Sequence, residues 1–430
     1  MDSLHTLTAT EIVAAIHAGR TTALAVAEEC LARIAEIEPT VGAWTHLDPD
    51  HVLRQARAVD RMPEPGPLQG VPVGLKDIID TADMPTEYGT PIHRGRRPSH
   101  DAACVALTRR AGGVVMGKTV TTEFANRFPG KTRNPHDPRR TPGGSSSGSG
   151  AAVGAGMVPL ALGTQTTAST IRPASFCGCV GYVPSRGDIR LSGVMEAAGS
   201  FDALGLMARS VEDIHLYRSV LVGVPMAALA RPALADLRVG VARTGFWEAC
   251  EPATRDAIER CASALARAGA RVSRVDLPAG FDAIAEAHRW VSSFEFVRNR
   301  AWEIDHHWER ISAPLREARI ADGMACDFAR YDASRATLRA CARQLDDIQR
   351  DHDVLLTPAA AGEAPLGLQS TGDASFSTLW TALNVPAVTL PLARGANGLP
   401  IGLQWIGSRW ADDRLLAAAR AVAHAIGPVA

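Results

Sequence analysis

The stretch 143–150 constrains this chain more than any other, because it reads Gly-Gly-Ser-Ser-Ser-Gly-Ser-Gly. An apolar run follows at 157–162, and a second polar run, Gly-Thr-Gln-Thr-Thr-Ala-Ser, occupies 163–169. Glycine permits backbone angles with positive φ and lets a ligand approach the main chain closely. Serine and threonine hydroxyls can act as nucleophiles or proton relays. Two such runs around one buried segment predict a site made of two loops joined by a helix or a strand.

Three other interpretations of the Gly/Ser run are weaker. A flexible linker would be followed by a break in composition, and none occurs here. The pentad 144–148 matches the G-x-S-x-G nucleophile elbow with Ser146 in the middle, but a Ser/Gly tract produces that match cheaply. A phosphate-binding P-loop is excluded, because no Gly-Lys-Ser or Gly-Lys-Thr follows the glycines.

Composition indicates an ordinary soluble globular protein. Of the 430 residues 46% are hydrophobic and 21% are charged, and the net charge is −1 at pH 7. Such a chain has no electrostatic footprint for nucleic acid or an anionic membrane, and no window is apolar enough to span a bilayer. The N-terminus lacks the basic and apolar regions of a signal peptide, so we expect a cytoplasmic protein.

Eight cysteines are scattered along the chain, which argues against a disulfide framework. Cys177 and Cys179 are too close together for a usual zinc half-site without a second pair nearby. We therefore expect mostly buried, unpaired cysteines, and neither a metal nor another cofactor.

Lysine is scarce, since only Lys76, Lys118 and Lys131 occur among 45 basic residues. A desolvated lysine can lose its proton and an arginine cannot, so a lysine kept in an arginine-rich chain is a candidate base. Lys76 interrupts an apolar stretch, 71–80, that predicts a buried strand, where a charge is costly unless it is paired or neutral. Asp77 would point to the opposite face of that strand and is a poor partner, which favours a functional role for Lys76.

Hydrophobic periodicity predicts alternating helices and strands, typical of a single α/β domain over 1–430. The predicted helices are 10–18, 21–38, 51–61, 101–111, 151–158, 210–223, 252–268 and 412–426. The predicted strands are 71–80, 114–117, 176–184, 237–242, 271–276, 353–358, 387–391 and 401–406, with a turn at Asn397-Gly398 between the last two. Segment 281–350 is predicted to be all helical. Its large aromatics, which we expect to be mainly core with some lining a substrate pocket, are Trp290, Phe294, Trp302, Trp308 and Phe328.

The central segment resembles the hallmark of the amidase signature family. The matching residues are 143–150, 163–166, Ser169 and 171–178, a long and specific motif. Further similarity lies at 70–77, 122–124, 134–142, 353–358 and 398–407, so the resemblance covers nearly the whole chain and is weakest at 281–350. It implies an α/β fold with a large mixed, mostly parallel twisted β-sheet flanked by helices on both faces, and a signature core at about 65–215.

Members of that family hydrolyse amides, and some cleave carbamates or esters, with a Ser–cis-Ser–Lys triad. Carried over residue by residue, the resemblance makes Ser169 the nucleophile, Ser145 the bridging serine after a cis peptide bond, and Lys76 the base. A serine hydroxyl needs a base to attack a carbonyl, and a lysine can serve when burial lowers its pKa. The implied donors to the tetrahedral oxyanion are the backbone N–H groups of Thr166, Thr167, Ala168 and Ser169.

The loop before the nucleophile departs from the family pattern. The usual residues there are Ala or Gly and then Gly, whereas this chain has Thr167 and Ala168. Side chains at these positions narrow the oxyanion hole or restrict its backbone, which affects efficiency and acyl-group choice rather than the chemistry. Gln165 also stands where Asp is commoner.

Three functions compete. The favoured one is a monomeric or homodimeric hydrolase that cleaves a small-molecule amide or carbamate through an acyl-enzyme on Ser169. The aromatic content of 281–350 favours a bulky, uncharged substrate such as an anilide or aryl carbamate, with Tyr88, Phe128 and Arg172 as candidate contacts. The second is the catalytic subunit of a tRNA-dependent amidotransferase, which needs partner subunits and whose members usually run longer. The third is a ligand-binding homologue with little catalysis, against which the intact triad argues.

Overall fold

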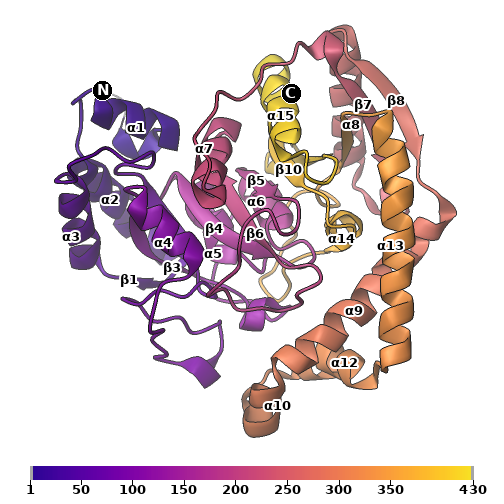
Figure 1. Cartoon of the computed structure of the whole chain (residues 1–430), viewed down its shortest axis with the longest axis horizontal. Coiled ribbons are helices and arrows are strands. Elements are labelled where there is room, and N and C mark those ends of the chain that lie inside the picture. Colours follow the sequence, from indigo (N-terminus) through magenta and orange to yellow (C-terminus); the bar gives the residue numbers. More distant parts are fainter. Residues whose placement is uncertain (1–2, 428–430) are drawn as a thin grey trace.

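The computed structural model describes residues 3–427, whose strands form one sheet of eleven (Figure 1). In their order across the sheet, the strands are β1 (Trp44–Leu47), β3 (Val114–Thr119), β2 (Pro72–Lys76), β4 (Leu160–Gln165), β6 (Ala203–Ala208), β5 (Val180–Val183), β10 (Ala387–Arg394), β11 (Pro400–Ile406), β9 (Val354–Pro358), β7 (Arg238–Arg243) and β8 (Arg271–Asp276).

The sheet is mixed, as the sequence predicts, but it is not mostly parallel. Within the described sheet, six of the ten strand pairings are antiparallel. The parallel pairings are confined to β3–β2–β4 and to β9–β7–β8. The mostly parallel sheet that the family resemblance implied is therefore wrong: β6 lies antiparallel to both β4 and β5, and pairings of β1, β10 and β11 supply the other four antiparallel pairs. The β10–β11 hairpin, with Gly398 at φ 74°, adds another antiparallel pair, as its turn residues predicted.

Helices cover both faces of this sheet. They are α1 (Ala9–His17), α2 (Ala23–Val41), α3 (Pro49–Val59), α4 (Ala103–Arg110), α5 (Ser147–Gly154), α6 (Ile171–Cys177), α7 (Val211–Val222), α8 (Pro252–Arg267), α9 (Ile284–Asn299), α10 (Ala301–His307), α11 (Ala313–Leu315), α12 (Ala321–Ala325), α13 (Phe328–Arg350), α14 (Ser375–Ala382) and α15 (Asp412–Ile426). Strand β6 contacts α5 and α7, and β10 contacts α6 and α15; α5 packs on α6, whereas α7 packs on α15. The pairs α5–α6 and α7–α15 therefore lie on opposite faces.

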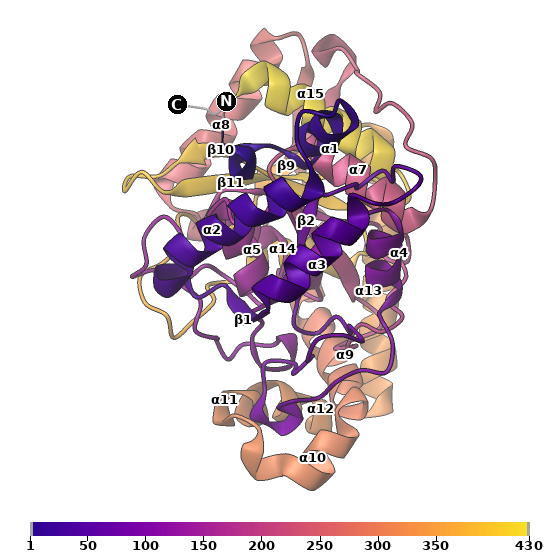
Figure 2. The same ribbon diagram turned by 90° about the vertical axis from the view of Figure 1, so that its left-hand side faces the viewer.

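Segment 281–350 is helical, as predicted. Helices α10 and α12 lie away from the sheet (Figures 1 and 2), whereas α13 shares a hydrophobic cluster with residues of β7, β8 and β9. Of the five large aromatics of this segment only Phe294 is buried, whereas Trp302 and Phe328 are 53% and 69% exposed. The expectation that these rings are mainly core is therefore wrong for most of them. No helix within residues 3–427 is long and apolar enough to cross a membrane.

The elements that flank the Gly/Ser run differ from the predictions. The strand predicted at 176–184 begins only at Val180, because helix α6 occupies the preceding residues and ends at Gly178 with φ 72°. Helix α5 begins at Ser147 rather than 151, and its Gly148 is required because a Cβ there would collide with the Ala43 carbonyl oxygen. Close packing thus imposes helix on residues of poor helix propensity. Helix α14 was not predicted.

Lys118, on β3, is fully buried and secures the loop that follows β2. Its Nζ donates to the Ile79 carbonyl oxygen and to Thr86 Oγ1 (2.7 Å), and it lies 3.8 Å from Asp77 Oδ1. Burial lowers the pKa of Lys118 and raises the pKa of Asp77. Asp77 is therefore the charge partner of Lys118 and not of Lys76, as expected because neighbouring side chains in a strand point to opposite faces.

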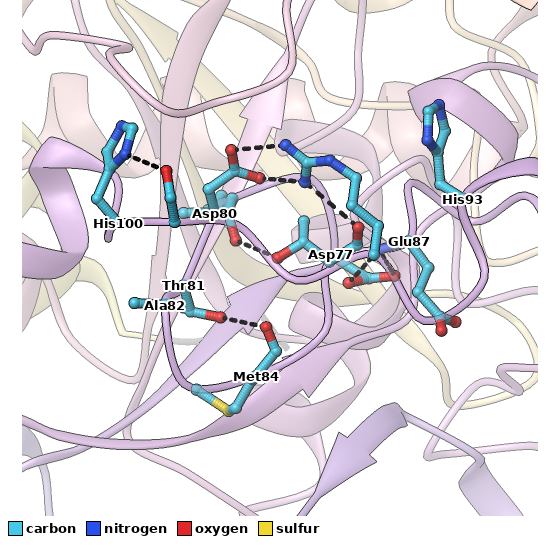
Figure 3. Close-up of polar contacts among 12 residues, drawn as sticks. Asp77, Asp80, Thr81, Ala82, Met84, Glu87, His93 and His100 are labelled. Carbon is cyan, nitrogen blue, oxygen red and sulfur yellow. Dashed lines mark hydrogen bonds and ion pairs between the residues drawn. The ribbon is translucent and has the colours of Figure 1, made fainter.

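The same loop is fixed by a second ion pair (Figure 3). Asp80 accepts hydrogen bonds from both terminal nitrogens of Arg96, at 2.7 and 3.0 Å. Asp77 in turn accepts from the backbone N–H of Glu87 at 3.2 Å. These contacts hold the chain rigidly just beyond the strand that ends in Lys76.

We expect Lys118→Met to lower the free energy of unfolding by roughly 3–5 kcal/mol at pH 8, because it leaves Asp77 buried without its cation. The loss should be smaller at pH 5, where the folded chain can protonate Asp77, whose pKa burial already raises. Urea unfolding at both pH values measures this. Lys131→Met is the matched control, because that lysine side chain is 61% exposed and should change stability by less than about 0.5 kcal/mol. Equal effects of the two variants would contradict the assignment.

Candidate active site

Lys76 is the last residue of β2 and is completely buried. Its Nζ donates to Ser145 Oγ (2.7 Å) and to Thr164 Oγ1 (2.7 Å). Thr164 reaches this position because β4 pairs in parallel with β2. The amine therefore lies between the Gly/Ser run and the strand that follows it, with two hydroxyls as its hydrogen-bonding partners.

Burial lowers the pKa of Lys76 to about 7. The carboxylate of Asp202 opposes this shift and raises the pKa. Asp202 is itself buried, and it accepts hydrogen bonds from Thr166 Oγ1 (2.5 Å) and from the backbone N–H groups of Ala197 and Ala198 (2.7 and 2.9 Å). Burial raises the pKa of Asp202 to about 6. Near neutral pH the Lys76 amine is therefore partly unprotonated and can accept a proton.

Ser145 is the residue of the run 143–150 that lines the cavity described below. The peptide bond between Gly144 and Ser145 is cis. The other hydroxyls of the run bind backbone: Ser147 Oγ donates to the Gly143 carbonyl oxygen (2.8 Å) and Ser149 Oγ to that of Leu162 (2.9 Å).

Ser146 does not act as the nucleophile of an elbow. It is fully buried, and its Oγ both donates to the Thr164 carbonyl oxygen and accepts from the Thr164 N–H, each at 3.2 Å. This pair of bonds attaches the Gly/Ser run to β4. The G-x-S-x-G match is thus a by-product of a Ser/Gly tract.

The loop 166–169 is held through its carbonyl groups. All four carbonyl oxygens accept hydrogen bonds, and the donors in order are His288 Nε2 (2.8 Å), Thr381 Oγ1 (2.7 Å), the Arg172 N–H (3.1 Å) and the Ser146 N–H (3.2 Å). Within residues 3–427 the four backbone N–H groups of this loop donate to no acceptor. The loop therefore offers several free donors beside Ser169, the arrangement that a developing oxyanion requires.

Ser145 and Ser169 line one cavity of about 1010 Å³. Its remaining wall comes from the segments 125–129, 166–168, 285–293, 314–322 and 369–378, together with Arg172. Phe128 and Arg172 line it, whereas Tyr88 is not among its lining residues and packs edge-on against His93. None of the five large aromatics of 281–350 lines this cavity. The aromatic side chains that led us to expect a bulky aromatic substrate therefore do not line the cavity.

Arg172 positions the residue that precedes Ser145. Its Nη2 donates to the Gly144 carbonyl oxygen (2.7 Å) and to Thr371 Oγ1 (3.1 Å). Burial lowers its pKa to about 10, so it keeps its charge at neutral pH. Arg172 thus joins the Gly/Ser run to the segment 369–378, which also lines the cavity.

Sequence reasoning missed three residues of this site, Thr164, Asp202 and His288. Thr164 lies two residues before Thr166 in the predicted polar run, so its involvement could have been proposed from position. Asp202 stands directly before the unpredicted strand β6, and His288 lies in the segment of weakest resemblance. Burial lowers the pKa of His288 to about 4, so it is neutral and donates to Thr166 through Nε2.

Comparison with known proteins shows which family this chain resembles. The Amidase family model matches residues 25–416. The chain is 35% identical to the A subunit of the glutamyl-tRNA(Gln) amidotransferase of Chloroflexus aurantiacus, over 97% of this chain and 96% of that protein. It is 31% identical to 2-amino-5-chloromuconic acid deaminase of Comamonas testosteroni, over 99% and 97%. The solved structure of native peptide amidase from Stenotrophomonas maltophilia matches with a TM-score of 0.86 and 29% identity, over 98% and 97%.

Fold, site and relatives together define a hydrolase that acts on amides. The chain belongs to the Amidase family, whose model covers nearly its whole length.

Lys76→Met should increase the free energy of unfolding at pH 7. Folding lowers the Lys76 pKa from 10.5 to about 7. Between pH 10.5 and pH 7 the unfolded state therefore binds more protons than the folded state, and the stability of the wild type falls as the pH is lowered through this range. One pKa unit corresponds to about 1.4 kcal/mol. Allowing for two lost hydrogen bonds, we expect a gain of roughly 1–4 kcal/mol at pH 7 that nearly vanishes at pH 10. Urea unfolding at both pH values measures it, and a loss of stability at pH 7 would contradict it.

Proposed function

We propose that the chain is a serine hydrolase that cleaves the C–N bond of an amide or carbamate through an acyl-enzyme on Ser169. The contact between Lys76 Nζ and Ser145 Oγ, at 2.7 Å, carries this proposal. A neutral amine has a lone pair, so the Ser145 hydroxyl can give it a proton and then take one from Ser169. No metal-binding group of three or more His, Cys, Asp or Glu side chains occurs among residues 3–427, and the proposed steps use only protein groups.

The first half-reaction forms the acyl-enzyme. Ser169 Oγ attacks the carbonyl carbon while its proton passes to Ser145 Oγ and the Ser145 proton passes to Lys76 Nζ. The negative oxygen of the tetrahedral intermediate accepts hydrogen bonds from the free N–H groups of 166–169. When the intermediate collapses, the C–N bond breaks and the proton returns from Lys76 through Ser145 to the leaving nitrogen. Water then attacks the acyl-enzyme by the same proton path and releases the acid.

The loop departures at Thr167 and Ala168 leave this scheme intact. Thr381 Oγ1 donates a hydrogen bond to the Thr167 carbonyl oxygen. This bond fixes the peptide unit between Thr167 and Ala168, and the Ala168 N–H points away from Thr381 because N–H and C=O are on opposite sides of a trans peptide. Both residues line the cavity next to Ser169. Acyl groups that are slim near the carbonyl carbon fit this wall best.

A second function, as one component of a multi-subunit amidotransferase, is favoured by the 35% identity to the Chloroflexus glutamyl-tRNA(Gln) amidotransferase chain. The near-complete coverage of that relative means that length does not separate the two functions. We favour a stand-alone hydrolase, a monomer or homodimer in the cytoplasm, since peptide amidase shares the fold and a similar extent of identity. The near-neutral charge gives no support to nucleic-acid binding. Gel filtration and a glutaminase assay of the purified chain test the second function, because it requires partner subunits and release of ammonia from glutamine. A chain that is a stable monomer or homodimer and releases no ammonia from glutamine contradicts the second function.

Ser169→Ala should lower kcat by at least about a thousandfold on any substrate that the wild type cleaves, because the nucleophile is lost. It should also abolish covalent labelling by a fluorophosphonate, detected as the mass increase of a peptide containing 169. Ser273→Ala is the control, since Ser273 lies on β8 in contact with His352, outside the cavity. Labelling that survives Ser169→Ala would disprove the proposal, as would a wild type that is never labelled, which is the outcome expected of a ligand-binding homologue.

The pH profile should report the protonation of Lys76. We expect kcat/KM to rise with pH through about 7, because the base acts only after losing its proton. Asp202→Asn should move this midpoint to lower pH by roughly one unit, since the Asp202 carboxylate stabilises the charged amine. The fluorophosphonate labelling rate at a series of pH values provides a substrate-independent measurement. A midpoint that is unchanged or higher in Asp202→Asn would contradict the electrostatic link.

A further inference from the structure

The cavity beside Ser169 holds more arginine than its carboxylates neutralise. Arg289 is paired with Asp322, another lining residue. Three further arginines line the cavity, and none has a carboxylate oxygen within 4.0 Å among residues 3–427; they are Arg127, Arg172 and Arg319. Besides Asp322, the acidic lining residues are Glu317 and Asp373, and the Asp373 carboxylate accepts from the N–H and Oγ of Ser375 (3.0 and 2.7 Å). The cavity thus carries an excess of positive charge.

Arg319 lines the cavity with one guanidinium nitrogen available to a ligand: among residues 3–427 its Nη1 donates to no acceptor, and it is not one of the buried unpartnered side-chain nitrogens. It lies in the π-helical turn Arg316–Ile320, partly buried, and its Nη2 donates to the Ser292 carbonyl oxygen (3.1 Å). The guanidinium stacks over Phe296 with its carbon 4.6 Å from the ring centroid, and its Nε is buried with no hydrogen-bond partner. Burial lowers the pKa of Arg319 to about 10, so it remains a cation at neutral pH.

Arg172 and Arg127 differ from Arg319 in their hydrogen bonds and in their exposure to solvent. Within the described part of the chain, Arg172 donates only through Nη2, to Gly144 and Thr371, and its Nε and Nη1 have no hydrogen-bond partner but are buried. Arg127 is exposed on the loop 125–129 at the cavity wall, and its charge lowers the pKa of both Arg172 and Arg319. Three like charges therefore converge on one partly enclosed space, which concentrates an anion there. The more distant carboxylates of Asp202 and Glu295 raise the Arg319 pKa without pairing with it.

Helix α9 fixes the spacing between Arg319 and the acyl-transfer loop. His288 on this helix donates to the Thr166 carbonyl oxygen, and Ser292, four residues later, accepts from Arg319. Four residues advance about 6 Å along a helix. A ligand with its carbonyl at Ser169 can therefore place a second group on Arg319 across a short spacer.

We propose that the amide cleaved at Ser169 carries a carboxylate group, and that Arg319 is the specificity-determining residue that binds it. A guanidinium binds a carboxylate through charge-assisted, directional hydrogen bonds. Four arginines and three carboxylates line the cavity, so an anionic substrate supplies the counter-charge for the remaining positive charge, and Arg127 adds attraction at the cavity wall. This inference rests on the proposed hydrolase function, replaces the expected uncharged substrate, and names the class of amide that the site takes.

The test compares carboxylates with neutral isosteres in two matched pairs. With the carboxylate on the acyl side, the pair is succinyl-4-nitroanilide and levulinyl-4-nitroanilide; with it on the amine side, the pair is N-acetyl-4-aminobenzoate and N-acetyl-4-aminoacetophenone. We expect the wild type to favour the acid in at least one pair by roughly 10- to 100-fold in kcat/KM. Arg319→Met should remove that preference mainly by raising KM for the acid, and Arg319→Lys should restore part of it.

Arg298→Met is the matched control. Arg298 also lies over an aromatic ring, Phe294, and donates to a backbone carbonyl oxygen of α9, but it does not line the cavity. Its loss should leave the ratio between acid and isostere unchanged. A purely structural role for Arg319 predicts instead that Arg319→Met lowers turnover of the acid and the isostere equally, and that result would overturn the proposal.

A second measurement does not depend on finding a substrate. Succinate should protect Ser169 of the wild type from fluorophosphonate, succinamide should not, and the protection should be lost in Arg319→Met but kept in Arg298→Met. Absence of both a preference for the acid and protection by succinate, in a wild type that is labelled, disproves the carboxylate site. Failure of the wild type to be labelled at all counts against the hydrolase itself, so the two failures are distinguishable.

Discussion

The buried amine of Lys76, with two hydroxyls as its hydrogen-bonding partners, is the contact from which the rest of the site follows. An ammonium group in this position is desolvated, and the pKa of about 7 expresses that cost. The parallel pairing of β2 with β4 brings Thr164 to the amine, and the cis bond before Ser145 lies in the turn that brings its hydroxyl there. Arg172 holds the same turn from the other side through Gly144. Strand, turn and arginine together hold this buried polar contact beside the cavity.

The three lysines show how environment divides one residue type among different tasks. Lys76 has hydroxyl partners and a distant carboxylate, Lys118 has a nearby carboxylate at 3.8 Å, and Lys131 is largely exposed beside Glu38. Burial lowers the pKa of both Lys76 and Lys118. Only at Lys76 does the freed lone pair face a hydroxyl that lines the cavity, so a lowered pKa alone does not identify the base.

Much of the site was predictable because Ser145 and Ser169 lie in one segment with a specific pattern and Lys76 stands out in an apolar strand. The polar run ending at Ser169, the Gly/Ser run and the isolated Lys76 could all be recognised before any coordinates. The fold was less predictable: β6 is a short strand of apolar residues and glycine, and α6 is a short buried helix, and in neither does periodicity distinguish helix from strand. Aromatic content also misled, because composition does not show which way a side chain faces.

By itself, the sequence determined the local chemistry: small residues where backbone must pass close to backbone, hydroxyls in two runs, and a lysine in an apolar strand. Only the tertiary structure decided which carbonyl groups of 166–169 are occupied and hence which N–H groups remain free, since His288 and Thr381 come from distant helices. It alone also decided that Arg319 and Ser169 line the same cavity. Hydrogen bonds and charge pairing between residues more than a hundred positions apart depend on how the chain packs, and a local sequence pattern does not contain that information.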